Sequence, residues 1–452
     1  MAQTAESLVE QAFPDEQRLE GLIDRVLSEA GAQGASAAEA GVSFDAGLSV
    51  TVRLGEVETL EFNRDRGLGV TVYFGQRKGS ASTSDWSEAA IRETVQAACS
   101  IARYTGEDAC AGLADADLMA KDVPDLSLCH PWGLGPEAAI ALARQCEDAA
   151  RGCDSRIDNS EGASVSSHQG LSVYGNTHGF VGGYPSTRHS VSCAVIARDE
   201  QGMQRDYWYT VARDAADMEA PEAVGRRAGE RTVRRLGARR LSTRQVPVLF
   251  AAELATGVIG HLVAAVRGGK LYRRASFLLD QAGKQIFPAF VRIDEQPHLP
   301  KALGSAPFDS EGVATAPSDL VRDGVLQRYV LDTYSARRLG LQTTANAGGV
   351  HNLVIEPGAR DFRAMLVEMG TGLLVTELMG QGINYVTGDY SRGAAGFWVE
   401  NGEIQYPVQE ITIAGNLKDM FRGIVAVGSD VESRGSIRSG SLLVERMTVA
   451  GE

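Results

Sequence analysis

Hydrophobic and polar residues alternate along short stretches in the first half of the chain. Residues 47–54 and 67–74 each place four apolar side chains on one side, at Leu48, Val50, Val52 and Leu54 and at Leu68, Val70, Val72 and Phe74. This period of two predicts half-buried antiparallel strands. Apolar residues spaced three to four apart predict helices over 16–30, 85–102, 135–151 and 216–236.

The same order of elements occurs twice before residue 242. Alternating stretches at 170–176, 188–198 and 204–213 predict a second group of strands, again followed by a helix. We therefore predict an N-terminal α+β domain over 1–242, a β-meander sheet with helices that is built from two structural half-repeats.

The remainder of the chain, 243–452, is mostly of strand character. "VPVLF" at 246–250 is a short apolar strand, and the turn pairs Asp323-Gly324 and Asn401-Gly402 each predict a hairpin. Between them lies one helix, predicted over 251–267 and closed by Gly268-Gly269. The fold class is therefore α+β, with a β-rich C-terminal domain of mainly antiparallel strands and one buried helix.

That helix contains His261. With about 100° of rotation per residue, His261 falls within the apolar stripe formed by Leu254, Val258, Leu262 and Ala265. A metal ligand is one interpretation, but the absence of further ligands nearby favours a buried or interface histidine with a hydrogen-bond partner. Two glycines in the helix, Gly257 and Gly260, predict close packing of another backbone.

Composition narrows the possible partners. The formal net charge of −14 opposes binding to a phosphate backbone. One basic run, 225–241, places Arg227, Arg231, Arg234 and Arg235 on roughly one helix side. A solvated face or an inter-domain contact is favoured over a nucleic-acid site, given the acidic chain.

Cysteine use and hydropathy bear on location. Six cysteines occur without a CxxC pair, as in a cytosolic protein with reduced thiols. No apolar run reaches the length of a membrane span, and the first residues lack the pattern of a signal peptide. We expect a cytoplasmic protein without a membrane partner.

The second half resembles a known family. The phrases that carry the likeness include "GHLVAAVRGGKLYRRASFLLD", "DSEGVATAP", "LDTYSARRLGLQTTANAGGVHNL" and "EMGTGLLVTELMGQGINYVTGDYSRGAAGFWVENGEIQYPVQEITIAGNL". They occur in the order typical of the TldD/PmbA family, on its PmbA (TldE) branch. The resemblance implies a two-domain fold and an intracellular protease assembled from a TldD subunit and a PmbA subunit.

TldD-type chains carry zinc on a His-Glu-x-x-x-His helix with a later cysteine. The metal requires two imidazoles, and a carboxylate must deprotonate the zinc-bound water. In the helix at 251–268, His261 matches the first histidine, whereas Leu262 and Val266 occupy the glutamate and second-histidine positions, and no cysteine follows Cys193. The resemblance therefore implies no catalytic or metal-binding residue here, and zinc is expected in the TldD-type partner.

Other sites are weaker candidates. The C-terminal histidines His261, His298 and His351 lie on separate segments without the spacing of metal ligands. The pair His178 and His189 is interpreted as surface or sheet histidine. Glycines in 370–382 lack phosphate-loop spacing and are assigned to turns. The carboxylates are scattered, at Asp309, Glu311, Asp389 and Glu400.

Three functions are compatible with the sequence. The first is a non-catalytic partner of a TldD-type protease subunit in the proteolysis of unfolded or leader peptides, inactive alone and able to form a homodimer. The second is a metallopeptidase or other hydrolase that acts on its own through an unrecognised site. The third and weakest is a regulator related to DNA gyrase.

Overall fold

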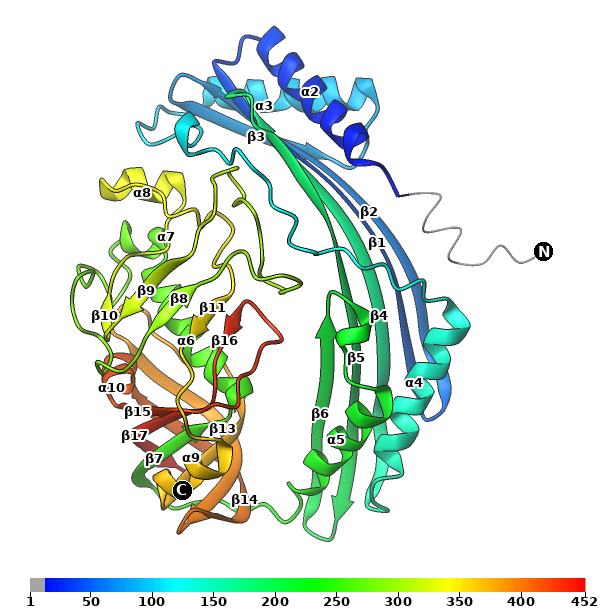
Figure 1. Cartoon of the computed structure of the whole chain (residues 1–452), viewed down its shortest axis with the longest axis vertical. Helices are drawn as coiled ribbons and strands as arrows, with labels where there is room; N and C mark the ends of the chain where they lie inside the picture. Colours follow the sequence, from blue (N-terminus) through cyan, green and yellow to red (C-terminus); the bar gives the residue numbers. More distant parts are fainter. Residues whose placement is uncertain (1–12, 452) are drawn as a thin grey trace.

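One long sheet dominates the first half of the computed structural model, which describes residues 13–451 (Figure 1). The predicted absence of a signal peptide concerns residues that lie largely outside this range. The strand order is β3-β2-β1-β4-β5-β6, and all neighbours are antiparallel. The strands are β1 (Ala37–Arg53), β2 (Glu56–Phe74), β3 (Arg77–Thr83), β4 (Ile157–Asn176), β5 (Val181–Asp199) and β6 (Gly202–Ala212).

The strands β1, β2, β4 and β5 are about two to three times as long as the sequence predicted. In β1 the alternation starts ten residues earlier, but small side chains at Ala38 and Ala40 carry it there and give a weak hydrophobic signal. The even-numbered residues of β1 are buried from Ala38 to Val52. They define the outer face of the sheet, and the odd-numbered residues define the inner face.

Two pairs of helices cover the outer face. The first pair packs on one half of the sheet and the second pair on the other half, each with its own apolar cluster. The order helix, three strands, helix occurs twice, which confirms the predicted half-repeats. Boundaries differ slightly from the prediction, since α3 begins at Glu88 after its cap Ser87 and Pro221 sets the start of α5. The helices are α2 (Glu16–Ala32), α3 (Glu88–Tyr104), α4 (Pro136–Arg151) and α5 (Pro221–Val233).

The second half contains two smaller sheets. One has the order β14-β13-β12-β7-β17-β15 and closes on itself through β14–β17, and the other has the order β10-β9-β8-β11-β16. The pairs β7–β12 and β11–β16 are parallel and the others antiparallel, as predicted. The strands are β7 (Arg244–Phe250), β8 (Ile293–Glu295), β9 (Ser318–Arg322), β10 (Val325–Leu326), β11 (Leu353–Ile355), β12 (Gly372–Met379), β13 (Asp389–Glu400), β14 (Glu403–Asn416), β15 (Ile424–Val427), β16 (Ile437–Arg438) and β17 (Leu442–Ala450).

The buried helix α6 (Ala252–Val266) packs against β7 and β12 of one sheet and β16 of the other. The expected close backbone packing at its glycines is wrong, because a Cβ on Gly257 would meet nothing within 4 Å. The predicted glycine cap is also wrong: α6 ends at an extended Arg267, and Gly268 begins α7. A Cβ on Gly268 would lie 2.0 Å from Ser335 Oγ, which explains the glycine. The remaining helices are α7 (Gly268–Leu271), α8 (Thr333–Leu339), α9 (Phe362–Met369) and α10 (Leu417–Arg422).

The arginine run forms an inter-domain contact, which is one of the two interpretations that the sequence favoured. Arg231 on α5 pairs with Asp206 of β6 at 3.5 Å and with Glu253 of α6 at 2.7 Å. Arg235 pairs with Asp206 at 3.6 Å and with Glu377 of β12. These guanidinium groups therefore form ion pairs with carboxylates of both halves of the chain.

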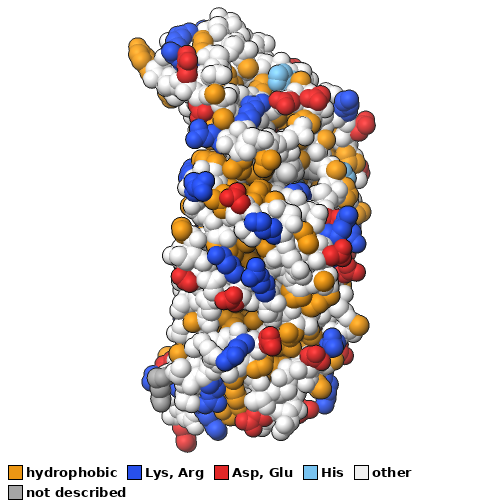
Figure 2. Space-filling view, turned by 90° about the vertical axis from the view of Figure 1, so that its left-hand side faces the viewer, with side chains coloured by type: hydrophobic (Ala, Val, Ile, Leu, Met, Phe, Trp, Pro, Cys, Tyr) orange, Lys and Arg blue, Asp and Glu red, His pale blue; other side chains and the backbone are white. Residues whose placement is uncertain are grey.

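The outer surface of the C-terminal half carries mixed charge. In Figure 2, Lys and Arg side chains lie interspersed with Asp and Glu on this face. No helix among residues 13–451 is long and apolar enough to cross a membrane.

Candidate functional site

A cleft of about 690 Å³ lies between the inner face of the long sheet and two loops of the C-terminal half. The sheet side is contributed by β1, β4 and β5, and the opposite side by loops at 303–310 and 347–351. In Figure 1 the C-terminal half faces the inner side of the curved sheet. The lining of the cleft therefore comes from segments far apart in the sequence.

The sheet side of the cleft combines small polar side chains with the rings of Tyr174 and Tyr184. Gly41, Ser43, Ser172 and Ser186 line it, and a Cβ on Gly41 would meet nothing within 4 Å. Small side chains at these inner-face positions leave the strands accessible to an extended ligand.

Two buried nitrogen atoms at the cleft have no hydrogen-bond partner among the described residues, Arg213 Nε and His351 Nε2. Arg213 donates through Nη1 to the Thr187 carbonyl and through Nη2 to the Leu303 carbonyl, both at 3.0 Å. It therefore links the sheet to the C-terminal loop. Burial lowers the pKa of Arg213 from its ordinary value. Both nitrogens are buried, and each is a polar group left unpaired at a cost in free energy.

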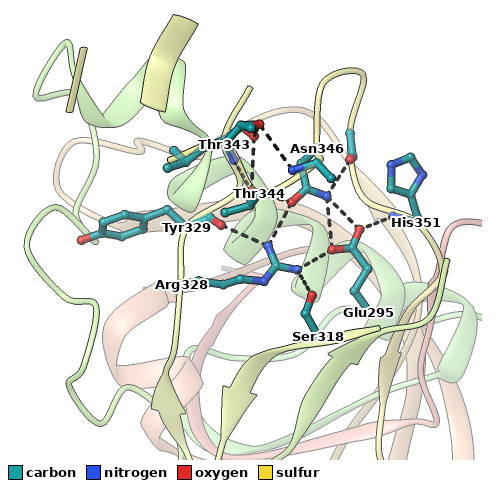
Figure 3. Close-up of polar contacts among 11 residues, drawn as sticks. Glu295, Ser318, Arg328, Tyr329, Thr343, Thr344, Asn346 and His351 are labelled. Atoms are coloured by element: carbon teal, nitrogen blue, oxygen red, sulfur yellow. Dashed lines mark hydrogen bonds and ion pairs between the residues drawn. The ribbon is translucent and has the colours of Figure 1, made fainter. Parts of the chain in front are cut away.

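A buried polar network holds the loop that carries His351. Glu295, 3% exposed, accepts hydrogen bonds from the Arg328 guanidinium, from Asn346 Nδ2 at 2.9 Å and from the backbone N–H of His351. Asn346 Oδ1 in turn accepts from Arg328 Nη1 at 2.9 Å and from Thr344 at 2.7 Å. Figure 3 shows Glu295 between Arg328, Asn346 and His351. Arg328 Nε has no partner among the described residues, but the other hydrogen bonds join three segments and fix one loop conformation.

Two carboxyl groups near the cleft are perturbed by burial. Asp309, 2% exposed, accepts from the backbone N–H groups of Glu311, Val313 and Ala347, yet burial raises its pKa. Burial, aided by Asp309 and Asp332, raises the pKa of Glu311 to about 7 although Thr333 donates to it. Glu311 therefore titrates near neutral pH.

The other candidate residues that the sequence suggested lie apart from Asp309 and Glu311. Asp389 bonds Thr387 and Asn416, and Glu400 accepts from Trp398 Nε1 at 2.8 Å. His178 lies on an exposed turn, and His189 on β5 bonds Ser167 and the His130 carbonyl.

Sequence reasoning missed Arg213 and Glu295. A signal for Glu295 was present in "VRIDEQ", where Val291, Ile293 and Glu295 share a parity and all three are buried. No local pattern distinguished Arg213, which acquires its role from two distant carbonyl groups.

His261 is half-buried and bonds Tyr385 Oη through Nδ1 at 3.0 Å. Its ring also meets Tyr390 edge-on, with 5.8 Å between centroids. Burial, with a smaller contribution from Arg392, lowers its pKa to about 4. The predicted hydrogen-bond partner is therefore present, and it is a tyrosine.

A zinc ion does not fit this helix. Leu262 and Val266 are fully buried in the main apolar cluster, and neither side chain offers a donor to a metal. His298 bonds Thr315 at 3.0 Å rather than His261. Within residues 13–451 no group of three His, Cys, Asp or Glu side chains is arranged to hold a metal ion.

The architecture matches solved structures over nearly the whole chain. A putative modulator of DNA gyrase from Bacteroides thetaiotaomicron has a TM-score of 0.92 at 28% identity, covering 97% of this chain and all of that one. TldE from Thermococcus kodakarensis, at 18% identity, shares the fold with a TM-score of 0.84 over 95% of this chain and all of that one. The fold defines the class: an α+β protein with the architecture of these solved structures.

Sequence comparisons identify the family. Models of PmbA/TldA metallopeptidase domain 1, central domain and C-terminal domain match residues 38–102, 129–236 and 243–451. Metalloprotease PmbA of Escherichia coli O157:H7 is 57% identical over 415 residues, 92% of each chain. The PmbA homolog of Haemophilus influenzae is 51% identical over 437 residues, covering 96% of this chain and 97% of that one. The chain belongs to the PmbA/TldD family, on its PmbA side.

Removing Glu295 should destabilise the protein strongly. Glu295→Ala leaves the Arg328 guanidinium buried without its carboxylate, which costs about 3–5 kcal/mol in comparable sites. Glu410→Ala is the matched control, because its pair with Arg240 is exposed and is worth about 0–1 kcal/mol. Urea unfolding curves measure both variants. Equal losses for the two would contradict the assigned role of the network.

The raised pKa of Glu311 predicts a pH-dependent stability. A carboxyl group with a folded pKa of about 7 contributes stability that is complete below its unfolded pKa and is lost as pH rises through 7. Glu311→Gln should therefore match the wild type near pH 4 and be more stable at pH 8, by about 3 kcal/mol. Thermal unfolding at both pH values tests this, and a wild type that is no less stable than the variant at pH 8 excludes the shift.

His261 should remain neutral down to about pH 4. Because its folded pKa is lowered, its contribution to stability is present above its unfolded pKa and is lost as pH falls towards 4. Titration of the imidazole carbon-bound protons by NMR measures this pKa directly. Arg392→Gln should raise it, since Arg392 opposes the protonated ring; an unchanged pKa in that variant would refute the electrostatic contribution.

Proposed function

We propose that this chain is the non-catalytic PmbA/TldE-type subunit of a metalloprotease. It holds an extended, unfolded or leader peptide in the inter-domain cleft, while a TldD-type partner contributes zinc and the catalytic base. This chain binds no zinc of its own. We also assign it to the cytoplasm, in keeping with six free cysteines.

The observation that carries the proposal is the burial of Leu262 and Val266. Zinc hydrolysis requires a carboxylate and a second imidazole at these positions, and here both positions face the apolar interior, fully buried. His261 is engaged by Tyr385. The helix therefore supports the structure of the C-terminal half rather than chemistry.

The cleft suits an extended backbone. Gly41 and Ser43 leave room beside β1, and a peptide lying there meets hydroxyl groups from Ser172 and Ser186. Arg213 and His351 line the same cleft, and rotation of either side chain would bring its unpaired nitrogen, Arg213 Nε or His351 Nε2, to a peptide main chain. These groups recognise main chain more than side chains, so binding is tolerant of sequence.

A second candidate is hydrolysis by this chain alone, and Glu311 favours it. A carboxyl group with a pKa of about 7 near a cleft has the protonation behaviour of a general base. No metal set accompanies it among the described residues.

The test is a peptide-cleavage assay with metal analysis, on this chain alone and with a TldD-type partner. We expect zinc and chelator-sensitive cleavage only when the partner is present. Stoichiometric zinc in this chain, or cleavage by it alone, overturns the proposal. Loss of such cleavage in Glu311→Gln would establish the second candidate instead.

The role of the cleft is tested in the same assay. Gly41→Phe fills open space in the cleft and should raise the KM of the complex about tenfold, equivalent to about 1.4 kcal/mol of binding. Gly21→Phe is the matched control, on helix α2 beyond the outer face and also in open space. Equal kinetics for the two variants would remove the cleft from the mechanism.

A further inference from the structure

Three side chains on the inner face of the long sheet lie in the order of a nucleophile, a base and a carboxylate. His168 of β4 is placed between Asp45 and Ser49 of β1. Its Nδ1 is 3.4 Å from Asp45 Oδ1, and its Nε2 is 3.5 Å from Ser49 Oγ. Catalysis by a Ser-His-Asp triad requires this order of atoms, on whichever fold it occurs.

The geometry of the strands explains why the three side chains meet. Asp45, Gly47 and Ser49 are alternate residues of β1 and therefore face the same side of the sheet. His168 pairs directly with Gly47, at the centre of the three. A Cβ on Gly47 would lie 2.2 Å from His168 Nδ1, so glycine is required for the imidazole to lie over the strand. Gly170 makes room likewise, because a Cβ there would lie 3.0 Å from Asp45 Oδ2.

The carboxylate fixes the tautomer of the imidazole. An ionised Asp45 only accepts hydrogen bonds, so His168 Nδ1 carries the proton and Nε2 accepts a hydrogen bond from the Ser49 hydroxyl. Both distances are longer than in an ideal hydrogen bond, as is common in active sites without a bound substrate. The nitrogen that faces Ser49 is therefore the one that can take its proton.

Ser49 differs from the neighbouring hydroxyl groups of the inner face. Thr51 bonds Ser164 at 2.8 Å, and Ser166 bonds Ser190 at 2.7 Å, so these hydroxyl groups satisfy one another. Within residues 13–451, the side chain of Ser49 bonds the histidine instead. Ser166 pairs directly opposite Ser49, which places a hydroxyl group beside any group attached to Ser49 Oγ.

Solvent reaches these three residues. The side chains of His168 and Asp45 are 33% and 50% exposed, and Ser49 is half-buried. His168 precedes Ser172 by four residues on β4, so it lies about 13 Å from the part of the strand that lines the cleft. The three residues therefore form a site separate from the inter-domain cleft.

We propose that Ser49, His168 and Asp45 form a serine esterase site for carboxylic esters with a good leaving group. Ser49 Oγ attacks the carbonyl carbon while His168 Nε2 takes the hydroxyl proton. The C–O bond to the leaving group then breaks, and the proton passes to the departing alcohol. Water cleaves the acyl-serine by the same route and restores Ser49.

The position of Ser49 limits the chemistry to esters. β1 is hydrogen-bonded to a strand on each side, so its backbone N–H groups are engaged in the sheet and do not form an oxyanion hole. An activated ester needs less of this stabilisation than a peptide bond, because its leaving group departs more readily. The esterase site therefore does not depend on the proposed protease function, which concerns peptide bonds and zinc.

Labelling of the full chain with a fluorophosphonate probe, with a chelator present, tests the nucleophile. The probe phosphonylates an activated serine with loss of fluoride, and we expect one adduct by intact mass, located at Ser49 by peptide mapping. Ser49→Ala and His168→Gln should abolish the adduct. Ser192→Ala, on the same face but on β5, is the matched control and should label like the wild type. An unlabelled wild type, or an adduct that survives either of the first two substitutions, overturns the proposal.

The positioning role of Asp45 is tested by hydrolysis of p-nitrophenyl acetate, after subtraction of the rate of Ser49→Ala. Asp45→Asn should lower kcat roughly 10- to 100-fold with little change in KM, because the amide can donate to Nδ1 and favour the other tautomer. Nitrogen NMR should show the His168 proton on Nδ1 in the wild type and on Nε2 in this variant. Asp45→Glu should restore part of the rate. A wild-type proton on Nε2, or full activity in Asp45→Asn, refutes the role of Asp45.

Discussion

The arrangement of the two halves depends on the burial of Asp206. This carboxylate, 5% exposed, lies on β6, the edge strand of the long sheet, and is neutralised by Arg231 of α5 and by Arg235 just beyond that helix. The same two guanidinium groups reach Glu253 at the start of α6 and Glu377 on β12. A buried charge without its partners is far more costly than an exposed one, so sheet, α5 and C-terminal half are held in one geometry. The cleft is a consequence of that geometry.

A second attachment sets the other side of the cleft. Lys301 pairs with Asp214 at 2.7 Å and Asp217 at 3.2 Å, and Arg213 bonds the Leu303 carbonyl. The loop that carries these contacts is the loop that lines the cleft. The opposite loop is held by Glu295 from within the C-terminal half. Both walls are therefore positioned before any ligand arrives, which reduces the entropy lost on binding.

These attachments explain which features the sequence could predict. The α6 helix, the hairpins and the half-repeats follow from local periodicity, since each depends on residues that are neighbours along the chain. The cleft joins Ser43, Arg213 and His351, whose proximity depends on the ion pairs around Asp206. The length of β1 was underestimated because alanine and glycine carry its alternation. The glycine cap of α6 was mispredicted because Gly268 is required by its close contact with Ser335, which is distant in the sequence.

The interior of α6 has its own consequence for function. A fully buried Leu262 contributes roughly 1.5–3 kcal/mol by leaving water, whereas a carboxylate in the same place would lose its hydration without gaining a partner. Core packing therefore requires an apolar side chain at this position, whereas zinc chemistry requires a carboxylate. The sequence has the apolar side chain. His261 is compatible with both, because Tyr385 satisfies its Nδ1 and burial keeps it neutral. The helix therefore serves the packing of the C-terminal half.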